Sequence, residues 1–289
     1  MPMPTRFGHE FSGDVADVAA GVTAFSREDA VMCVHTAPCG ACFWCTHAQE
    51  ELCESIMGTM ILGAYSDFIA VPQRIVERNC FKKPPDVSYA EGAFLEPLAC
   101  VVHSVRTLAP PANSVAAVLG NGAFGILHAL LLRREGIEAL LFGRRPGRVA
   151  LARELGLESF DTRSVSIADT IKERTQGRGA DAAIECTGSL EMWESAPSYV
   201  RRGGRVSFFA GLPMEARVSF LAARLHYDEV QLLAPFHFTP ADVRAAFDLI
   251  AARDLPLRQL ITHSGGLNTI VATFATLDAG EGMKALVEP

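Results

Sequence analysis

Four of the eight cysteines in this 289-residue chain lie within one stretch of fifteen residues, close enough to bind a metal ion. They follow the pattern C-x2-C-x2-C-x7-C and are Cys39, Cys42, Cys45 and Cys53. Thiolates two residues apart in a tight turn can point at one centre, and Gly40 suits such a turn. Four thiolates complete a tetrahedral zinc shell and leave no position for a substrate, so we predict a structural site. Local disulfides, free buried thiols and an iron–sulfur cluster are the alternatives, and His47 could replace one cysteine.

A glycine-rich segment near the middle of the chain predicts a dinucleotide site. Its sequence, Gly120-Asn121-Gly122-Ala123-Phe124-Gly125, has the form G-x-G-x-x-G between an expected strand (114–119) and an expected helix (124–135). Gly120 makes the turn, Gly122 lets the backbone approach a pyrophosphate, and Gly125 lets helix and strand pack closely. The helix N-terminus then faces the phosphates, and we expect Ala123 and Phe124 to lie against the cofactor. A glycine turn that only packs is the alternative.

The end of the next expected strand (138–142) selects between the two nicotinamide cofactors. An NAD-binding protein usually has an acidic residue here, which binds the ribose 2′-hydroxyl. This chain instead has Gly143, followed by Arg144 and Arg145. Glycine leaves room for a 2′-phosphate, and the arginines supply charge-assisted hydrogen bonds to it. We therefore predict a preference for NADP over NAD, unless both arginines are ordinary solvated surface charges.

Three further residues have side chains of the kinds that bind metals, two near the start of the chain and one before an expected helix. His9 and Glu10 are adjacent, and Glu96 precedes Pro97, which is expected to start a helix beside an apolar run. A catalytic zinc needs about three protein ligands and one open position. Spacing alone makes these residues weak candidates, because a lone histidine or glutamate is more often structural or solvated.

The expected secondary structure that positions these residues changes near Pro110-Pro111, from a β pattern to alternating strands and helices. Before it, short apolar runs broken by Gly, Pro and Cys, such as 63–71, predict a barrel-like β region. After it, strands and helices alternate, which predicts βαβ units and a parallel sheet, hence an α/β fold. We expect a helix over 190–200 closed by Gly203-Gly204, a strand over 205–209, a helix starting at Pro240, and closing strands over 260–262 and 284–287.

Composition excludes several classes of function. Apolar residues make up 49% and charged residues 20% of the chain, as in globular proteins, and the length suits two domains. The net charge of -7 and the lack of a long basic run disfavour nucleic acid or an anionic membrane as partner. No signal-peptide pattern opens the chain and the apolar runs are short, so we expect a cytoplasmic protein.

Taken together, the motifs resemble the zinc-dependent medium-chain dehydrogenase family over essentially the whole chain. Its zinc signature is matched by Gly8-His9-Glu10, Gly13, Ala19 and Val22, its structural zinc lobe by the four cysteines, and its cofactor turn by residues 120–125. Further matches are Arg148, where the family often contacts adenosine, and the runs 185–188, 203–204 and 209–213, with Cys186, Thr187 and Gly211 expected to contact the cofactor. The segments 225–227 and 236–240 resemble the sorbitol, threonine and glucose dehydrogenase branches.

The resemblance implies a GroES-like β-barrel catalytic domain over 1–108, a Rossmann NADP-binding domain over 109–236, and a return to the catalytic domain over 237–289. It implies an active site between the domains, with His9 and Glu96 as catalytic zinc ligands and Glu10 as an exchangeable or outer ligand. The implied reaction is oxidation of a secondary alcohol, polyol or sugar, with hydride passing to the nicotinamide. We also expect a homodimer or homotetramer.

One departure from the family affects these expectations. The family usually has a Cys-Gly-Thr/Ser-Asp segment several dozen residues before Gly-His-Glu, and that cysteine is a catalytic zinc ligand. Here only seven residues precede Gly8, so the predicted barrel is truncated. Either the true start lies upstream, or the chain is an NADP-binding, structural-zinc protein with weak or no catalysis. Cys33 and Cys100 are possible substitutes, but buried thiols are the better interpretation of both.

Overall fold

The computed structural model describes residues 6–288, which form two compact units. One unit comprises the residues up to His103 together with those from His237 onward, and the other comprises Ser104–Phe236. The chain re-enters the first unit at His237. The earlier division falls between His103 and Ser104, inside helix α4 (Leu95–Leu108), rather than at 108/109.

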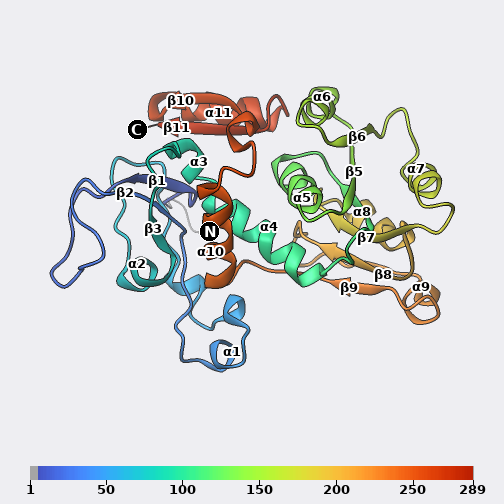
Figure 1. The fold of residues 1–289 in the computed structure, drawn as a ribbon, viewed down its shortest axis with the longest axis horizontal. Helices are drawn as coiled ribbons and strands as arrows, with labels where there is room; N and C mark the ends of the chain where they lie inside the picture. Colours follow the sequence, from blue (N-terminus) through green and yellow to red (C-terminus); the bar gives the residue numbers. More distant parts are fainter. Residues whose placement is uncertain (1–5, 289) are drawn as a thin grey trace. The chain divides into compact units, whose positions relative to one another are not determined.

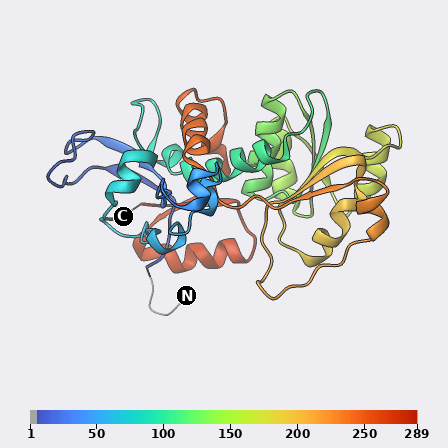
Figure 2. The same cartoon turned by 90° about the horizontal axis from the view of Figure 1, so that it is seen from below.

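The second unit is built on a six-stranded parallel sheet with helices on both faces (Figures 1 and 2). The strand order is β6-β5-β4-β7-β8-β9. The chain adds strands on one side of β4 as far as β6, then crosses over and adds β7, β8 and β9 on the other side of β4. This is the doubly wound arrangement that places ligands at the carboxyl ends of the central strands. The strands are β4 (Val115–Leu119), β5 (Glu138–Gly143), β6 (Glu158–Asp161), β7 (Ala180–Glu185), β8 (Val200–Phe208) and β9 (Gln231–Leu233).

Burial explains why these segments form strands. β4, β5 and β7 are almost continuously buried, as expected for parallel strands covered on both faces. Their register is regular, with Leu119 opposite both Phe142 and Glu185. The covering helices are α5 (Ala123–Arg134), α6 (Pro146–Glu154), α7 (Ile167–Arg174), α8 (Leu190–Ser195) and α9 (Ala222–His226).

One expectation for this unit is wrong: the helix from Leu190 does not reach 200. It ends at Ser195, and a 3-10 turn over Ala196–Ser198 follows. Pro197 cannot continue the α-helical hydrogen bonding, so the chain turns into β8 at Val200, opposite Ala180. Gly203 and Gly204 consequently lie inside β8, next to a register shift, rather than beyond a helix end.

The first unit contains a three-stranded antiparallel sheet in the order β1-β2-β3. Its strands are β1 (Phe11–Asp14), β2 (Ala30–Cys33) and β3 (Cys80–Lys82). Residues 63–71, in the part of the chain expected to form a barrel-like β region with loops, have loop and bend conformations in the structure. Apolar runs alone do not make a strand, because a strand also needs a neighbour to pair with. Gly63 and Ala64 only donate two backbone hydrogen bonds to the Gly8 carbonyl.

The C-terminal part of the chain completes the first unit. Helix α10 (Pro240–Ala251) begins with the expected cap, in which Thr239 and Asp242 form a capping box around Pro240. The predicted closing strands are confirmed as β10 (Ile261–Gly266) and β11 (Lys284–Glu288), which pair in parallel and pack against α11 (Ile270–Asp278) (Figure 1). The remaining helices are α1 (Phe43–Thr46), α2 (Gln73–Asn79) and α3 (Tyr89–Gly92).

Within residues 6–288, every helix is too short or too polar to traverse a lipid bilayer.

Candidate functional site

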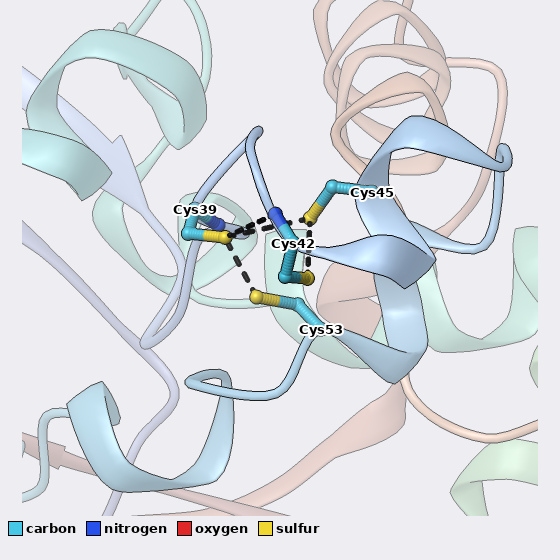
Figure 3. Close-up of side chains that lie close together, drawn as sticks. All are labelled: Cys39, Cys42, Cys45 and Cys53. Atoms are coloured by element: carbon cyan, nitrogen blue, oxygen red, sulfur yellow. Dashed lines mark hydrogen bonds between the residues drawn. The ribbon is translucent and has the colours of Figure 1, made fainter.

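The four cysteines of the lobe converge on one point (Figure 3). The Sγ atoms of Cys42 and Cys45 are 3.5 Å apart, and those of Cys39 and Cys45 are 3.8 Å apart. A tetrahedral zinc ion with Zn–S bonds near 2.3 Å separates its sulfur ligands by about 3.8 Å. The same separations exclude disulfides, since bonded sulfurs lie about 2.05 Å apart. The residues therefore fit the predicted structural zinc site.

Local backbone geometry builds this lobe. Gly40 has a φ of +78°, the left-handed conformation expected of the tight turn. The N–H groups of Ala41 and Cys42 donate to the Cys39 sulfur, and the Cys39 N–H donates to the Cys53 sulfur. Burial opposes ionisation of Cys53, but hydrogen bonds from Ser55 and Cys39 outweigh it and lower the thiol pKa to about 6. Such bonds favour the thiolate, which is the form that binds zinc.

Two other side chains of the lobe stand outside the ligand group. His47 is exposed and its Nδ1 lies 2.7 Å from the Phe43 carbonyl oxygen, so it does not replace a cysteine in the group. Trp44 packs its ring edge-on against Phe43, with centroids 5.3 Å apart. The Trp44 carbonyl accepts hydrogen bonds from the His47 and Gln49 N–H groups, and these bonds close the turn between Cys45 and Cys53.

The glycine-rich turn lies between β4 and α5, as predicted. Gly120 has a φ of +115°, and a Cβ there would lie 3.0 Å from the Thr187 methyl carbon. A Cβ on Gly125 would lie 1.8 Å from the Gly120 oxygen, so the first turn of α5 requires glycine. A Cβ on Gly122 would meet only the Arg148 guanidinium, at 3.8 Å. The backbone at Gly122 is therefore open, and α5 begins at Ala123 without a side-chain cap on its free N–H groups.

At the carboxyl end of β5, Gly143 is also a steric requirement. A Cβ at this position would lie 1.9 Å from Asn121 Cγ, so the Asn121 side chain occupies the space that an acidic residue would need. Arg145 is the N-cap residue of α6, and Arg148 follows in its first turn. Burial lowers the pKa of Arg148, and the positive charge of Arg145 lowers it further. Two guanidinium groups thus lie close together beside the turn, whereas Arg144 is exposed.

The loop after β7 contains the Glu185-Cys186-Thr187-Gly188 run. Glu185 is fully buried and accepts hydrogen bonds from the Thr187 N–H at 2.6 Å, the Thr187 hydroxyl, and the Gly188 N–H at 3.3 Å. These bonds hold Thr187 beside Gly120. Farther along, a Cβ on Gly188 would lie 3.3 Å from the Gly211 oxygen. The loop therefore places Cys186, Thr187 and Gly211 together near the glycine-rich turn.

Trp193 supports the same end of the sheet. Its ring stacks on Phe208 at the end of β8, with centroids 4.1 Å apart and planes at 16°. The indole N–H donates to the Ala210 carbonyl at 2.9 Å. This packing fixes the segment that leads into Gly211.

A second ligand group forms in the first unit from three segments distant in sequence. It consists of His9, His35 and Glu96, whose ligand atoms all lie within 4.8 Å of one another. His9 Nε2 is 3.9 Å and His35 Nδ1 is 3.6 Å from Glu96 Oε1. Glu96 comes from the first turn of α4, while His35 follows β2 and His9 precedes β1. The structure thus brings the predicted His9 and Glu96 together and adds His35, which sequence reasoning missed.

Burial sets the protonation states of this group. It lowers the pKa of His35 to about 3, with smaller effects of His9 and His237, and it also lowers the pKa of His9. Burial raises the pKa of Glu96 to about 8, reinforced by Glu10 and opposed by Lys284. At neutral pH the imidazoles are therefore uncharged, so their contacts with Glu96 are not ion pairs in the metal-free protein. A divalent cation would favour the carboxylate and bind neutral imidazoles, so the donor set fits zinc.

Three other residues that the sequence suggested for this centre are not members of the ligand group. Glu10 lies outside the ligand group, and its carboxylate is paired with Lys284. Its role as an exchangeable or outer ligand stays a prediction. Cys100 donates from its sulfur to Glu96 Oε1 at 3.6 Å, and Cys33 donates to the Val34 carbonyl. Neither thiol belongs to the group that could bind a metal ion.

Comparison with known proteins assigns both units to one family. The family model of the alcohol dehydrogenase GroES-like domain matches residues 1–85, and that of the zinc-binding dehydrogenase matches residues 123–252. The 2-dehydro-3-deoxy-L-galactonate 5-dehydrogenase of Pseudoalteromonas atlantica is 30% identical over 289 residues, which cover 99% of this chain and 83% of its own. The sorbitol dehydrogenase of Halalkalibacterium halodurans is 27% identical over 292 residues, covering 99% of this chain and 84% of its own.

A solved structure agrees with these relatives. A zinc-binding dehydrogenase from Sinorhizobium meliloti 1021, solved with NADP bound, matches all of this chain and 84% of its own, with a TM-score of 0.91 and 26% identity. The fold class predicted from the sequence, a Rossmann sheet with a GroES-like domain, is thereby confirmed. The chain belongs to the zinc-dependent medium-chain alcohol and polyol dehydrogenase family and is an NAD(P)-dependent oxidoreductase.

Proposed function

We propose that this dehydrogenase transfers hydride between NADP and a secondary alcohol of a polyol or sugar at a zinc centre that includes His9 and Glu96. The observation that carries the proposal is the convergence of these two side chains, from opposite ends of the first hundred residues, with the half-exposed His9 imidazole beside the buried Glu96 carboxyl group. Ligand-type side chains without a metal have no physical reason to gather there, because burying a carboxyl group between imidazoles costs free energy.

Each part of this centre has a separate task. When bound, zinc would supply Lewis acidity toward an alcohol oxygen. Glu96 contributes the buried carboxylate, and His9 contributes the accessible imidazole, with 44% of its side chain exposed. The four thiolates of the lobe leave no open position, so their zinc would stabilise the fold without touching substrate.

The NADP preference is supported by the end of β5. Any side chain at Gly143 would collide with Asn121, so the acidic residue that binds a ribose 2′-hydroxyl has no space there. Arg145 and Arg148 concentrate positive charge beside the glycine-rich turn, and Arg144 adds an exposed cation. A 2′-phosphate would balance this charge. The Sinorhizobium meliloti relative was solved with NADP, which agrees with this proposal.

The substrate class follows from the relatives. Sorbitol and 2-dehydro-3-deoxy-L-galactonate, the compounds in the names of two of them, are both polyhydroxylated and carry secondary alcohols. We therefore place the substrate of this chain among polyols, sugars and sugar acids. Assembly into a homodimer or homotetramer and a cytoplasmic location stay predictions from the sequence.

Cofactor titration tests the nucleotide part. Zinc-loaded protein is expected to bind NADP more tightly than NAD by calorimetry. The Arg144→Ala/Arg145→Ala double variant should lose roughly 10- to 100-fold in NADP affinity with little change for NAD, because charged hydrogen bonds to the 2′-phosphate are removed. Arg217→Ala, an exposed arginine outside the turn, is the matched control. Tighter binding of NAD by the unmodified chain would contradict the preference.

Turnover tests the chemical part. NADP reduction should be detectable with at least one member of a panel of polyols, sugars and sugar acids, and it should disappear when the metal is removed by a chelator. Folded protein with two bound zinc ions and no turnover on such a panel would instead support the alternative, an NADP-binding protein with little or no catalysis.

A further inference from the structure

We infer that His35 is the third protein ligand of the zinc centre that contains His9 and Glu96. The inference rests on the proposed zinc-dependent function and names a residue that the motifs of the chain do not identify. His35 lies two residues beyond the end of β2, and only 6% of its side chain is exposed. Its Nδ1 atom is buried and has no hydrogen-bond partner among the described residues.

An unpartnered buried ring nitrogen normally costs free energy, so its surroundings need an explanation. Glu96 Oε1 lies 3.6 Å from His35 Nδ1, which is beyond hydrogen-bond distance. The ring also lies 4.6 Å, centroid to centroid, from the ring of His9. The unpartnered Nδ1 atom of His35 therefore lies beside His9 and Glu96, the two other members of the ligand group.

The spacing of the three ligand atoms suits zinc. Zinc bonds to nitrogen and oxygen are about 2.0–2.1 Å long, so a tetrahedral centre separates neighbouring ligand atoms by about 3.4 Å. The two measured separations to Glu96 Oε1 are 3.6 Å and 3.9 Å, and all three atoms lie within 4.8 Å. Small side-chain rotations would bring them to bonding distance. Two imidazoles and one carboxylate are a ligand set of catalytic zinc sites and leave a fourth position open.

Other nearby donors are less suitable than His35. The Cys100 thiol contacts Glu96 but is not part of the group within 4.8 Å, and Glu10 is paired with Lys284. The Nε2 atom of His237 lies 2.6 Å from the Thr36 hydroxyl, so that nitrogen is already in a hydrogen bond. His35 is the side chain whose nitrogen is both unpartnered and aimed at the group.

Metal analysis of a His35→Gln variant tests the inference. The unmodified chain should contain two zinc ions after dialysis, and His35→Gln should keep only the zinc of the cysteine lobe. Removing outer-shell partners of zinc ligands typically weakens affinity by 10- to 100-fold, so loss of a direct ligand should exceed about 100-fold. His237→Gln is the matched control: it removes a neighbouring, half-buried imidazole, 5.3 Å from the His35 ring, and should keep both metals.

A cobalt spectrum provides a second readout that does not depend on activity. With zinc in the lobe and Co²⁺ in the second site, the visible absorption of tetrahedral Co²⁺ reports the ligand set directly. A His35→Asp variant, which restores a ligand atom, should recover metal binding with a shifted spectrum, even if His35→Gln folds poorly. An unchanged second-site affinity and cobalt spectrum in His35→Gln would show that His35 only packs. One zinc per unmodified chain would instead overturn the zinc centre of the proposed function, and this inference with it.

Discussion

The cysteine lobe and the His9–His35–Glu96 group are both ligand clusters of the first unit, yet they are assembled in opposite ways. The lobe takes all four ligands from one short segment, and backbone N–H groups hold its sulfurs in place. The other group takes each ligand from a different segment, and the fold alone brings them together. The geometry of the first cluster is therefore set by its own short segment, whereas the geometry of the second depends on how three distant segments pack together.

This difference predicts different energetic roles. A closed set of four thiolates couples metal binding to local folding, because the lobe has few buried residues of its own. A buried carboxyl group among neutral imidazoles costs stability in the metal-free state and is better explained by function than by packing.

The largest effect is expected from opening the lobe. Cys42→Ser removes one of four thiolates, so the chain should lose one zinc ion and roughly 3 kcal/mol or more of unfolding free energy. Zinc analysis and thermal unfolding measure both changes. His47→Gln, a change in the same lobe outside the ligand group, should alter neither. If Cys42→Ser unfolds like the unmodified chain, the lobe does not stabilise the unit.

The opposite pattern is expected at the second cluster. Glu96→Gln should reduce kcat/KM by about 100-fold or more, because the anionic ligand of the zinc centre is lost. Its melting temperature should stay close to that of the unmodified chain, since glutamine has nearly the same shape and removes a buried carboxyl group. Glu10→Gln should cost less activity than Glu96→Gln. Equal losses from the two variants would place Glu10 in the ligand set.

A buried histidine far from the ligand groups in sequence separates the effect of burial from that of metal binding, and its effect is confined to acid pH. His128 in α5 is also fully buried, with its Nε2 unpartnered among the described residues, but its ring lies against Phe209, its Nδ1 lies near the Cys186 sulfur, and it belongs to neither ligand group. Burial lowers its pKa to about 4. The folded state therefore resists a proton that the unfolded state takes up below about pH 6.5, so stability falls as the pH drops from 6.5 towards 4.

The expected loss at pH 4 is about 3 kcal/mol for this one group. Chemical denaturation across that pH range measures it. His128→Asn, whose amide can keep the 2.7 Å bond to the Phe124 carbonyl but cannot take up the proton, should show a shallower acid loss and an unchanged zinc content. An acid profile identical to that of the unmodified chain would refute the assignment to His128.

The features that could be predicted from the sequence are the local ones. In the cysteine lobe, the glycine-rich turn and the Thr239–Asp242 capping box, the interacting residues are close together in the sequence. Their spacing along the chain was therefore enough to predict how they are arranged. Apolar periodicity also identified the parallel sheet, because its central strands are buried on both faces.

The features that depend on tertiary contacts could not be predicted in the same way. His35 looks like any histidine after a short strand, and only the meeting of β2 with α4 places it beside Glu96. The apolar runs such as 63–71 predicted a barrel-like β region, but they did not show which residues would pair, and residues 63–71 pair with no strand within residues 6–288. The helix from Leu190 ends early because Pro197 is followed by a segment that pairs with β7.

The positions of the two tryptophans of the chain give each unit its own optical signal. Trp44 lies in the cysteine lobe, and Trp193 stacks on Phe208 near the end of the parallel sheet. Replacing either by phenylalanine leaves a chain whose emission comes from a single unit. Fluorescence of the two single-tryptophan variants would then follow the melting of each half separately, without any attached dye.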